Sequence, residues 1–338
     1  MSNTHNQTEF INDVSPLLCA SKKGHLDIVC ELLNQNVDIE TKDKNNNTPL
    51  HLASLNGHIN IVCELLNRKA DIEAKGTHDN SPLHYASIKN NINIVIELLN
   101  RNADIESKNK SGATPLIVAS LSGHIDIVIE LLNRNANINV LDNIYGMSLL
   151  HHVIGEGHIN IVCELLNRNA DIEFKSKKDN IIPLHWAINK NHFNIVCELL
   201  NRNANIEAID SNNMTPLHIA SLKGNKDIII ELLNHNANIK AKNSFKKTPY
   251  DIAVLKNHSN EIIILLNPIK LIKDNKVNKN DINYKDVLIK RIICPICFVN
   301  ERKIIFKCGH STCTQCSENI SKCSECKEQI VSRITLQL

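Results

Sequence analysis

The sequence predicts a mainly α-helical chain in which a solenoid of about eight helix pairs precedes a small α+β domain. Two observations lead to this prediction. A motif typified by "TPLHLA" at 48–53 returns regularly along the chain, and seven of the twelve cysteines lie between Cys294 and Cys326. We divide the chain into a tail at 1–9, a solenoid at 10–267, a linker at 268–290 and a C-terminal domain at 291–338.

The first motif occurs eight times, and successive starts lie 33 or 34 residues apart. A second motif follows ten residues after each start and is best seen in "HINIVCELLNRNADIE" at 158–173. A unit that recurs at this period buries its apolar face against its neighbours, so the period indicates a solenoid. The starts are Ser15, Thr48, Ser81, Thr114, Ser148, Ile182, Thr215 and Thr248.

Each repeat contains residues that begin and end helices. Thr48 suits an N-cap, and the proline that follows it suits the first helical position. Four aliphatic residues within 61–66 form one apolar stripe at the helical period. The second helix is expected to end at "NRNADIE", where asparagine tolerates the left-handed conformation of many C-caps. Lys69 replaces this asparagine in the second repeat, and we expect it to be strained.

The TPLH-like motif, the Gly57–His58 pair and the "ADI" exit resemble the ankyrin repeat over residues 10–267. The chain departs from that pattern by having Asn for the usual Gly in most loops, an inserted residue in two spacings, and no proline in the fifth repeat. The resemblance implies antiparallel helix pairs joined by extended loops. It also implies that a protein substrate binds to the loop tips and to the inner, concave face formed by the first helices.

Two sets of residues recur in register and are interpreted as structural. The histidines of the first motif should be hydrogen-bonding groups, because catalysis needs convergent groups rather than a periodic column. The cysteines of the second motif should be small, partly buried apolar residues. Trp186 and Tyr85 occupy the position of Leu52 and are predicted to lie in the core. The histidines are His51, His84, His151, His185 and His218, and the cysteines are Cys30, Cys63, Cys163 and Cys197.

Three sets of residues are candidates for substrate binding. An exposed apolar row flanked by lysines would suit a partner with apolar anchors and acidic neighbours. Alternatively, the row is half-buried against the next repeat and the lysines only solvate a face. The apolar row is Leu55, Ile88, Leu121, Leu222 and Leu255; the lysines are Lys23, Lys89, Lys190, Lys223 and Lys256; the loop tips hold Tyr145, Met147, Ile181, Met214 and Phe245.

The C-terminal cysteines form pairs with the spacing of zinc ligands. The eight candidate ligands, in order, are Cys294, Cys297, Cys308, His310, Cys313, Cys316, Cys323 and Cys326. They are enough for two tetrahedral Zn²⁺ sites. The spacing leaves open whether the two sites follow one another or interleave. A domain this short would take most of its folding energy from the metal.

The order Cys-Cys, Cys-His, Cys-Cys, Cys-Cys resembles the RING finger. The resemblance implies interleaved sites: Cys294, Cys297, Cys313 and Cys316 for one ion, and Cys308, His310, Cys323 and Cys326 for the other. It implies a ubiquitin-protein ligase that binds a ubiquitin-conjugating enzyme and ubiquitin without a covalent intermediate on this chain. By the same resemblance, Ile296 and Ile320 would contact the conjugating enzyme, and Lys327 would be the basic linchpin that bridges it to ubiquitin.

Two departures from the RING pattern favour a second interpretation. Ser324 stands where many active RING fingers have proline, and no large aromatic residue lies between Cys316 and Cys323. The alternative is a non-catalytic ankyrin scaffold whose zinc domain mediates assembly. A metabolic enzyme is not supported, because the sequence contains no evident nucleophile, phosphate-binding loop or acid pair.

The tail resembles the ends of inhibitor-of-apoptosis proteins and of the mind bomb ligases, which also join ankyrin repeats to RING fingers. Ile330, Ile334, Leu336 and Leu338 alternate as in a half-buried strand. In the inhibitor-of-apoptosis family such a tail pairs two RING fingers. The resemblance therefore implies a homodimer through this tail.

Composition excludes several other classes. The formal net charge of +2 does not indicate a nucleic-acid-binding protein. The start "MSNTHNQTEF" is not a signal peptide, and the longest aliphatic run, "IIILL" at 262–266, is too short to cross a membrane. Unsecreted chains keep their cysteines as thiols or metal ligands. We therefore expect a cytoplasmic protein, with the nucleus as the second compartment.

Overall fold

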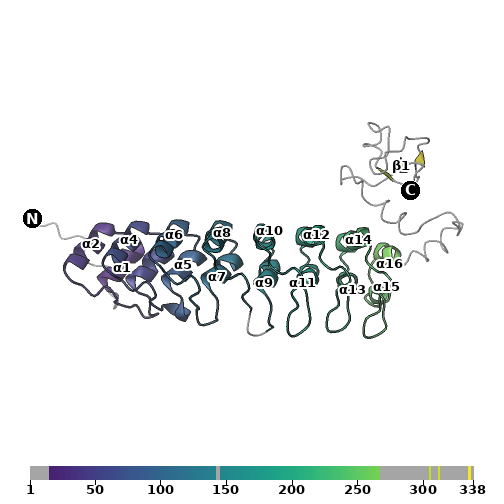
Figure 1. The fold of residues 1–338 in the computed structure, drawn as a ribbon, viewed down its shortest axis with the longest axis horizontal. Helices are drawn as coiled ribbons and strands as arrows, with labels where there is room; N and C mark the ends of the chain where they lie inside the picture. Colours follow the sequence, from purple (N-terminus) through teal and green to yellow (C-terminus); the bar gives the residue numbers. More distant parts are fainter. Residues whose placement is uncertain (1–14, 142–144, 267–303, 306–310, 313–333, 336–338) are drawn as a thin grey trace, which may run out of the picture. The chain divides into compact units, whose positions relative to one another are not determined.

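The computed structural model describes residues 15–141 and 145–266 and three short strands further along the chain (Figure 1). The chain divides into two compact units, Met1–Lys178 and Asp179–Leu338. The boundary falls in the loop before the sixth repeat. The repeat pattern continues in both units, so the predicted helix pairs are confirmed in each.

In the first unit, helix pairs stack side by side in two layers. One layer contains the first helix of each pair and the other contains the second (Figure 1). The first layer is α1 (Pro16–Lys23), α3 (Pro49–Asn56), α5 (Pro82–Ile88), α7 (Pro115–Leu121) and α9 (Leu149–Glu156). The second layer is α2 (Leu26–Asn34), α4 (Ile59–Asn67), α6 (Ile92–Asn100), α8 (Ile125–Asn133) and α10 (Ile159–Asn167), and a short 3₁₀ helix, η1 (Thr77–Asp79), lies in one loop.

The second unit repeats this arrangement with three helix pairs. The first helices are α11 (Pro183–Asn189), α13 (Pro216–Lys223) and α15 (Pro249–Leu255), and the second helices are α12 (Phe193–Asn201), α14 (Lys226–Asn234) and α16 (Asn260–Leu266). The described strands are β1 (Ile304–Ile305), β2 (Ser311–Thr312) and β3 (Ile334–Thr335). They form an antiparallel sheet in the order β2-β1-β3.

The first helices begin at the N-caps that the sequence predicts. Thr48 is extended, and both its hydroxyl and its backbone N–H lie within hydrogen-bond distance of His51 Nδ1, at 2.8 and 3.1 Å. The second helices end as expected, with asparagines in the left-handed conformation. Lys69 adopts the same conformation at φ 66°. The predicted strain at this position is confirmed, because a lysine tolerates positive φ less well than asparagine.

The core of each unit lies between the two helix layers. The stripe at 61–66 buries its aliphatic side chains, as do the inward-facing Leu50 and Ala53 of α3. In the second unit Leu217 and Ala220 of α13 and the aliphatic residues of α14 are buried in the same way. No single helix pair buries this surface alone, so stacking of adjacent repeats stabilises each one.

A close approach between repeats explains the glycine that ends α1. Gly24 has φ 84°, and a Cβ atom there would lie 2.7 Å from the ring of His58 in the next repeat. The same ring places its Nε2 3.0 Å from the carbonyl oxygen of Lys22. The Gly–His pair of the sequence motif therefore joins successive repeats.

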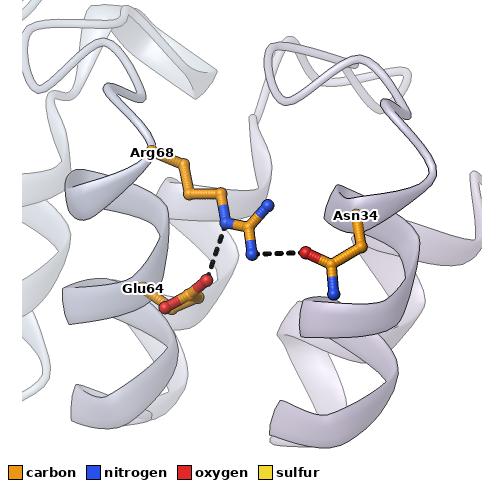
Figure 2. Close-up of polar contacts among 3 residues, drawn as sticks. All are labelled: Asn34, Glu64 and Arg68. Atoms are coloured by element: carbon orange, nitrogen blue, oxygen red, sulfur yellow. Dashed lines mark hydrogen bonds and ion pairs between the residues drawn. The ribbon is translucent and has the colours of Figure 1, made fainter.

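A polar ladder joins the second helices on the opposite layer. Arg68 forms an ion pair with Glu64, with 2.7 Å between Nε and Oε1, and donates from Nη2 to Asn34 Oδ1 at 2.7 Å (Figure 2). The same arrangement recurs at Arg101, Arg134 and Arg168. Gln35 takes the arginine position in the first repeat.

Among the described residues, no helix is long and apolar enough to cross a membrane.

Candidate functional site

The predicted apolar row of the first unit lies at the C-terminal ends of its first helices. Leu55, Ile88 and Leu121 are half-buried. The carbonyls of Ile88 and Leu121 accept hydrogen bonds from His124 and His158 in the following repeats, at 2.9 and 3.1 Å. α3, α5 and α7 pack side by side, so these three residues occupy the same register position on neighbouring helices. In this unit the half-buried interpretation of the row is therefore correct.

In the second unit the apolar row becomes more exposed towards the last repeat. Leu222 is half-buried, but Leu255 is 65% exposed. The lysines next to both residues, Lys223 and Lys256, are exposed. The sequence-based interpretation of an exposed apolar row flanked by lysines thus applies to the last repeat rather than to the whole column.

The other predicted lysines are exposed as well, and one of them contacts an aromatic ring. Lys23 and Lys89 are exposed in the first unit. Lys190 in the second unit places its Nζ 5.0 Å from the centre of the Trp186 ring, which is a cation–π contact. Trp186 is half-buried, so its assignment to the core was only partly right.

The loop tips expose two of the predicted aromatic residues. Tyr145 is 42% exposed, with Lys178 Nζ 5.1 Å from the centre of its ring. Phe245 is 73% exposed. Met147, predicted at a tip, is instead buried. It directly precedes the helix start at Ser148, where the chain turns into the core. Ile181 and Met214 are half-buried.

The register histidines are structural, as the sequence predicts. His51 is fully buried, and its Nε2 lies 3.0 and 3.1 Å from the carbonyl oxygens of Ala74 and Asn80. Burial lowers the pKa of His51 to about 4 and that of His84 to about 4, and it also lowers the pKa of His218. The neutral ring can accept at Nδ1 from the N-cap residue and donate at Nε2 to the loop carbonyls.

The cysteines of the second helices are half-buried thiols. Burial raises the pKa of Cys63 and raises that of Cys197 to about 11. Since the thiolate is the nucleophile, burial disfavours the reactive form of Cys63 and Cys197. The prediction of partly buried, apolar cysteines is confirmed at Cys30, Cys63, Cys163 and Cys197.

The eight predicted zinc ligands, Cys294 to Cys326, lie outside the described residues, as do Ile296, Ile320 and Lys327. Within the described part of the chain, no group of three or more His, Cys, Asp or Glu residues could hold a metal ion. The zinc sites and the contacts with a conjugating enzyme therefore stay predictions. The tail strand has a described partner, because β3 pairs with β1 of the same chain, with Ile334 opposite Ile305.

Sequence reasoning missed part of the exposed surface in the last repeat. Val254 is 40% exposed, and the lysines of the preceding loop, Lys242, Lys246 and Lys247, surround Phe245 in sequence and are exposed. A signal was present in the sequence. Val254 stands at the register position of Ser54 and Ser221, which are fully buried by the repeat that follows each of them.

These features define a solenoid repeat protein whose helix pairs are joined by hydrogen-bonded loops. Comparison with protein families identifies the particular repeat. The family described as ankyrin repeats in three copies matches residues 2–76, 73–142, 131–210 and 184–281. These matches cover most of the chain, so the chain belongs to the ankyrin-repeat family. Its repeats are accordingly protein-binding modules.

Shorter similarities connect the chain with ubiquitin ligases. It is 43% identical over 44 residues to E3 ubiquitin-protein ligase RGLG3 of Arabidopsis thaliana, a match that covers 13% of this chain and 12% of that protein. It is 40% identical over 47 residues to E3 ubiquitin-protein ligase MIB2 of Gallus gallus, covering 14% and 5%. E3 ubiquitin-protein ligase mind-bomb of Drosophila melanogaster is 36% identical over 47 residues, covering 14% and 4%. The chain thus matches 12% or less of the length of these relatives.

Proposed function

We propose that this chain is a RING-type ubiquitin-protein ligase that acts in the cytoplasm or nucleus. Its ankyrin repeats would bind a protein substrate, and its C-terminal domain would bind a charged ubiquitin-conjugating enzyme. The observation that carries the proposal is the order of the eight ligands from Cys294 to Cys326. The activity in the names of the relatives supports it.

The donor set suits two zinc ions. Seven thiols and one imidazole are the ligand types of structural tetrahedral zinc sites. In the interleaved arrangement Cys294, Cys297, Cys313 and Cys316 hold one ion, while the remaining four residues hold the other. Each site would contribute on the order of 10 kcal/mol to folding. The metal would therefore hold the domain in shape.

The chemistry would be positioning rather than covalent catalysis. With every cysteine of the domain bound to zinc, no free thiol remains there to form a thioester. Ile296 and Ile320 would contact the conjugating enzyme through apolar surface. Lys327 would bridge that enzyme and ubiquitin, and so restrict the thioester to a reactive orientation.

The pairing of β3 within its own chain limits how a homodimer could form through the tail. β3 pairs with β1 of its own chain and has no second neighbour among the described strands. The tail strand is therefore already covered on one edge within the chain. A second copy could add only to the other edge, and we keep the dimer as part of the proposal on that basis.

Autoubiquitination with a panel of conjugating enzymes tests the proposal. Wild-type chain should form ubiquitin conjugates with at least one of them, and Ile296→Ala should abolish transfer while two zinc ions per chain are retained. Ile28→Ala is the matched control, because Ile28 is an exposed aliphatic residue on α2, remote in sequence from the ligands. If the chain holds two zinc ions but no conjugating enzyme of the panel supports ubiquitin transfer, the result would point to the non-catalytic scaffold.

A further inference from the structure

The seventh and eighth repeats depart from most of the others at positions that join neighbouring repeats. Glu207 Oε1 accepts from the backbone N–H of Asn238 at 2.6 Å, and the equivalent bond joins Glu73 to Asp104 in the first unit. In the seventh repeat this register holds Lys240, whose ammonium group accepts no hydrogen bond; the fourth repeat, with Asn139, is the other that lacks the glutamate. The linking contact between loops therefore ends at this point.

The helices of the last repeat show the same change. Glu261 of α16 is exposed and pairs with Lys226 at 2.8 Å. The equivalent residue of α14, Ile228, is buried. Val254 of α15 is 40% exposed, whereas Ser221 at the same register of α13 is fully buried. The described surface of α15 and α16 is thus partly polar and partly apolar.

Apolar side chains on the last repeat and on the loop before it are unusually exposed. Phe245 and Leu255 are the two most exposed large apolar residues that the structure describes, at 73% and 65%. Phe245 lies in the loop before α15, and Leu255 ends that helix. α15 spans about 10 Å, and the chain from Phe245 to its first residue, Pro249, adds at most about 14 Å. An extended peptide covers this range of distances with about three to seven residues.

The same surface is positively charged. Lys242, Lys246 and Lys247 lie beside Phe245 in sequence, Lys256 follows Leu255, and all four are exposed. Within the described residues none of them forms an ion pair with a carboxylate. The nearest acidic residue in sequence, Asp251, accepts hydrogen bonds from the N–H and hydroxyl of Thr248, both at 2.8 Å. It therefore caps α15 and leaves the lysines largely unneutralised.

The lowered pKa of Asp251 is consistent with an excess of positive charge at this surface. The backbone hydrogen bond from Thr248 lowers the pKa of Asp251 most, and the positive charges of Lys247 and Lys242 lower it further. The carboxylate thus stays ionised beside the loop, and the lysines exceed it in number. A partner with negative charge is favoured at this face.

We infer that the last repeat, together with the loop that leads into it, binds an extended acidic segment of a partner protein. One apolar side chain of that segment contacts Phe245, and a second, about four or five residues away, contacts Leu255 and Val254. Carboxylates of the segment lie beside the four lysines. This inference names the substrate class for the proposed ligase, but it needs neither zinc nor ubiquitin transfer.

Fluorescence anisotropy with defined peptides and the full chain tests the inference. The probes are labelled peptides of about a dozen residues, each with two leucines about five positions apart, whose other side chains are mainly Glu, Gln or Lys. The Glu peptide should bind, more weakly as salt increases, while the Gln and Lys peptides should not. The double variants Phe245→Ser/Leu255→Ser and Lys246→Glu/Lys256→Glu should each lose about tenfold or more in affinity.

Matched controls lie in the first unit. Ile28→Ser replaces an exposed aliphatic residue on α2, and Lys44→Glu reverses an exposed lysine in a loop. Both should bind the Glu peptide like wild type, and thermal melting should show that all variants are folded. Three results would overturn the inference: equal binding of the Gln peptide, unchanged binding by the double variants, or tighter binding of a single-stranded oligonucleotide at the same residues. None of these results would affect ubiquitin transfer, so the two proposals fail separately.

Discussion

Replacing His51 with alanine should separate the second repeat from the loop that leads into the third. His51 Nδ1 accepts from the N–H of Thr48 at 3.1 Å. Its Nε2 therefore carries the proton and donates to the carbonyls of Ala74 and Asn80, at 3.0 and 3.1 Å. One buried ring thus satisfies the N-cap of α3 and orders the loop before α5.

The expected loss follows from these contacts. The variant leaves the Thr48 N–H and at least one carbonyl buried without their partner, at about 1–3 kcal/mol each, and adds a cavity. We expect the free energy of unfolding to fall by about 3–5 kcal/mol. His25→Ala is the control. It lies at the N-cap of α2 and is exposed without a side-chain cap bond, so its loss should stay within about 0.5 kcal/mol.

The effect should depend on pH with a definite sign. Burial lowers the pKa of His51 from 6.5 to about 4. Between these values the unfolded chain binds more protons, so the free energy of unfolding falls as pH falls, by about 1.4 kcal/mol per pH unit for this ring. The stabilisation from the neutral ring is present above pH 6.5 and is lost towards pH 4. The loss caused by His51→Ala should therefore shrink over that window.

Urea unfolding followed by far-ultraviolet circular dichroism measures both effects. Wild type, His51→Ala and His25→Ala would be compared at pH 7 and at several values down to 4.5. Parallel pH curves for wild type and His51→Ala, or a loss at pH 7 no larger than that of the control, would contradict this role of His51. Either result would mean that the ring does not hold the loop.

Three further predictions concern the ladder, the metal and the tail. Arg134→Ala breaks a partly exposed ion pair with Glu130 and a hydrogen bond to Asn100. In urea unfolding it should lower the free energy of unfolding by about 0.5–1 kcal/mol at low salt and by less at high salt. A salt-independent loss would contradict this. The purified chain should hold two zinc ions, and chelation should stop ubiquitin transfer while the helical signal persists; one ion per chain would be inconsistent with two sites. Deleting residues 334–338 removes β3, so the C-terminal domain should lose stability without losing zinc, because Cys326 precedes the cut. A wild type that is monomeric by light scattering at micromolar concentration would rule out the dimer.

Sequence reasoning located the helices and their ends because the caps and the apolar stripes are specified by residues within each repeat. Thr48 caps α3, and Lys69 adopts positive φ, as expected from their places in the motif. The buried stripe within 61–66 follows from the helical period, since its residues face one way whatever the neighbouring repeat contributes. The zinc ligands are predicted from their spacing, and they stay predictions.

Exposure was harder to predict, because it depends on what packs against each repeat. Tyr85 and Trp186 share one register position, yet Tyr85 is buried with its hydroxyl donating to Asn47 at 2.8 Å, while Trp186 is half-buried beside Lys190. Leu55 and Leu255 also share a register position. Leu55 is half-buried because another first helix follows α3, whereas among the described residues none follows α15. The motif specifies which side chain occupies each position of a repeat, and only the stacking of the next repeat decides whether that side chain is covered or available to a partner.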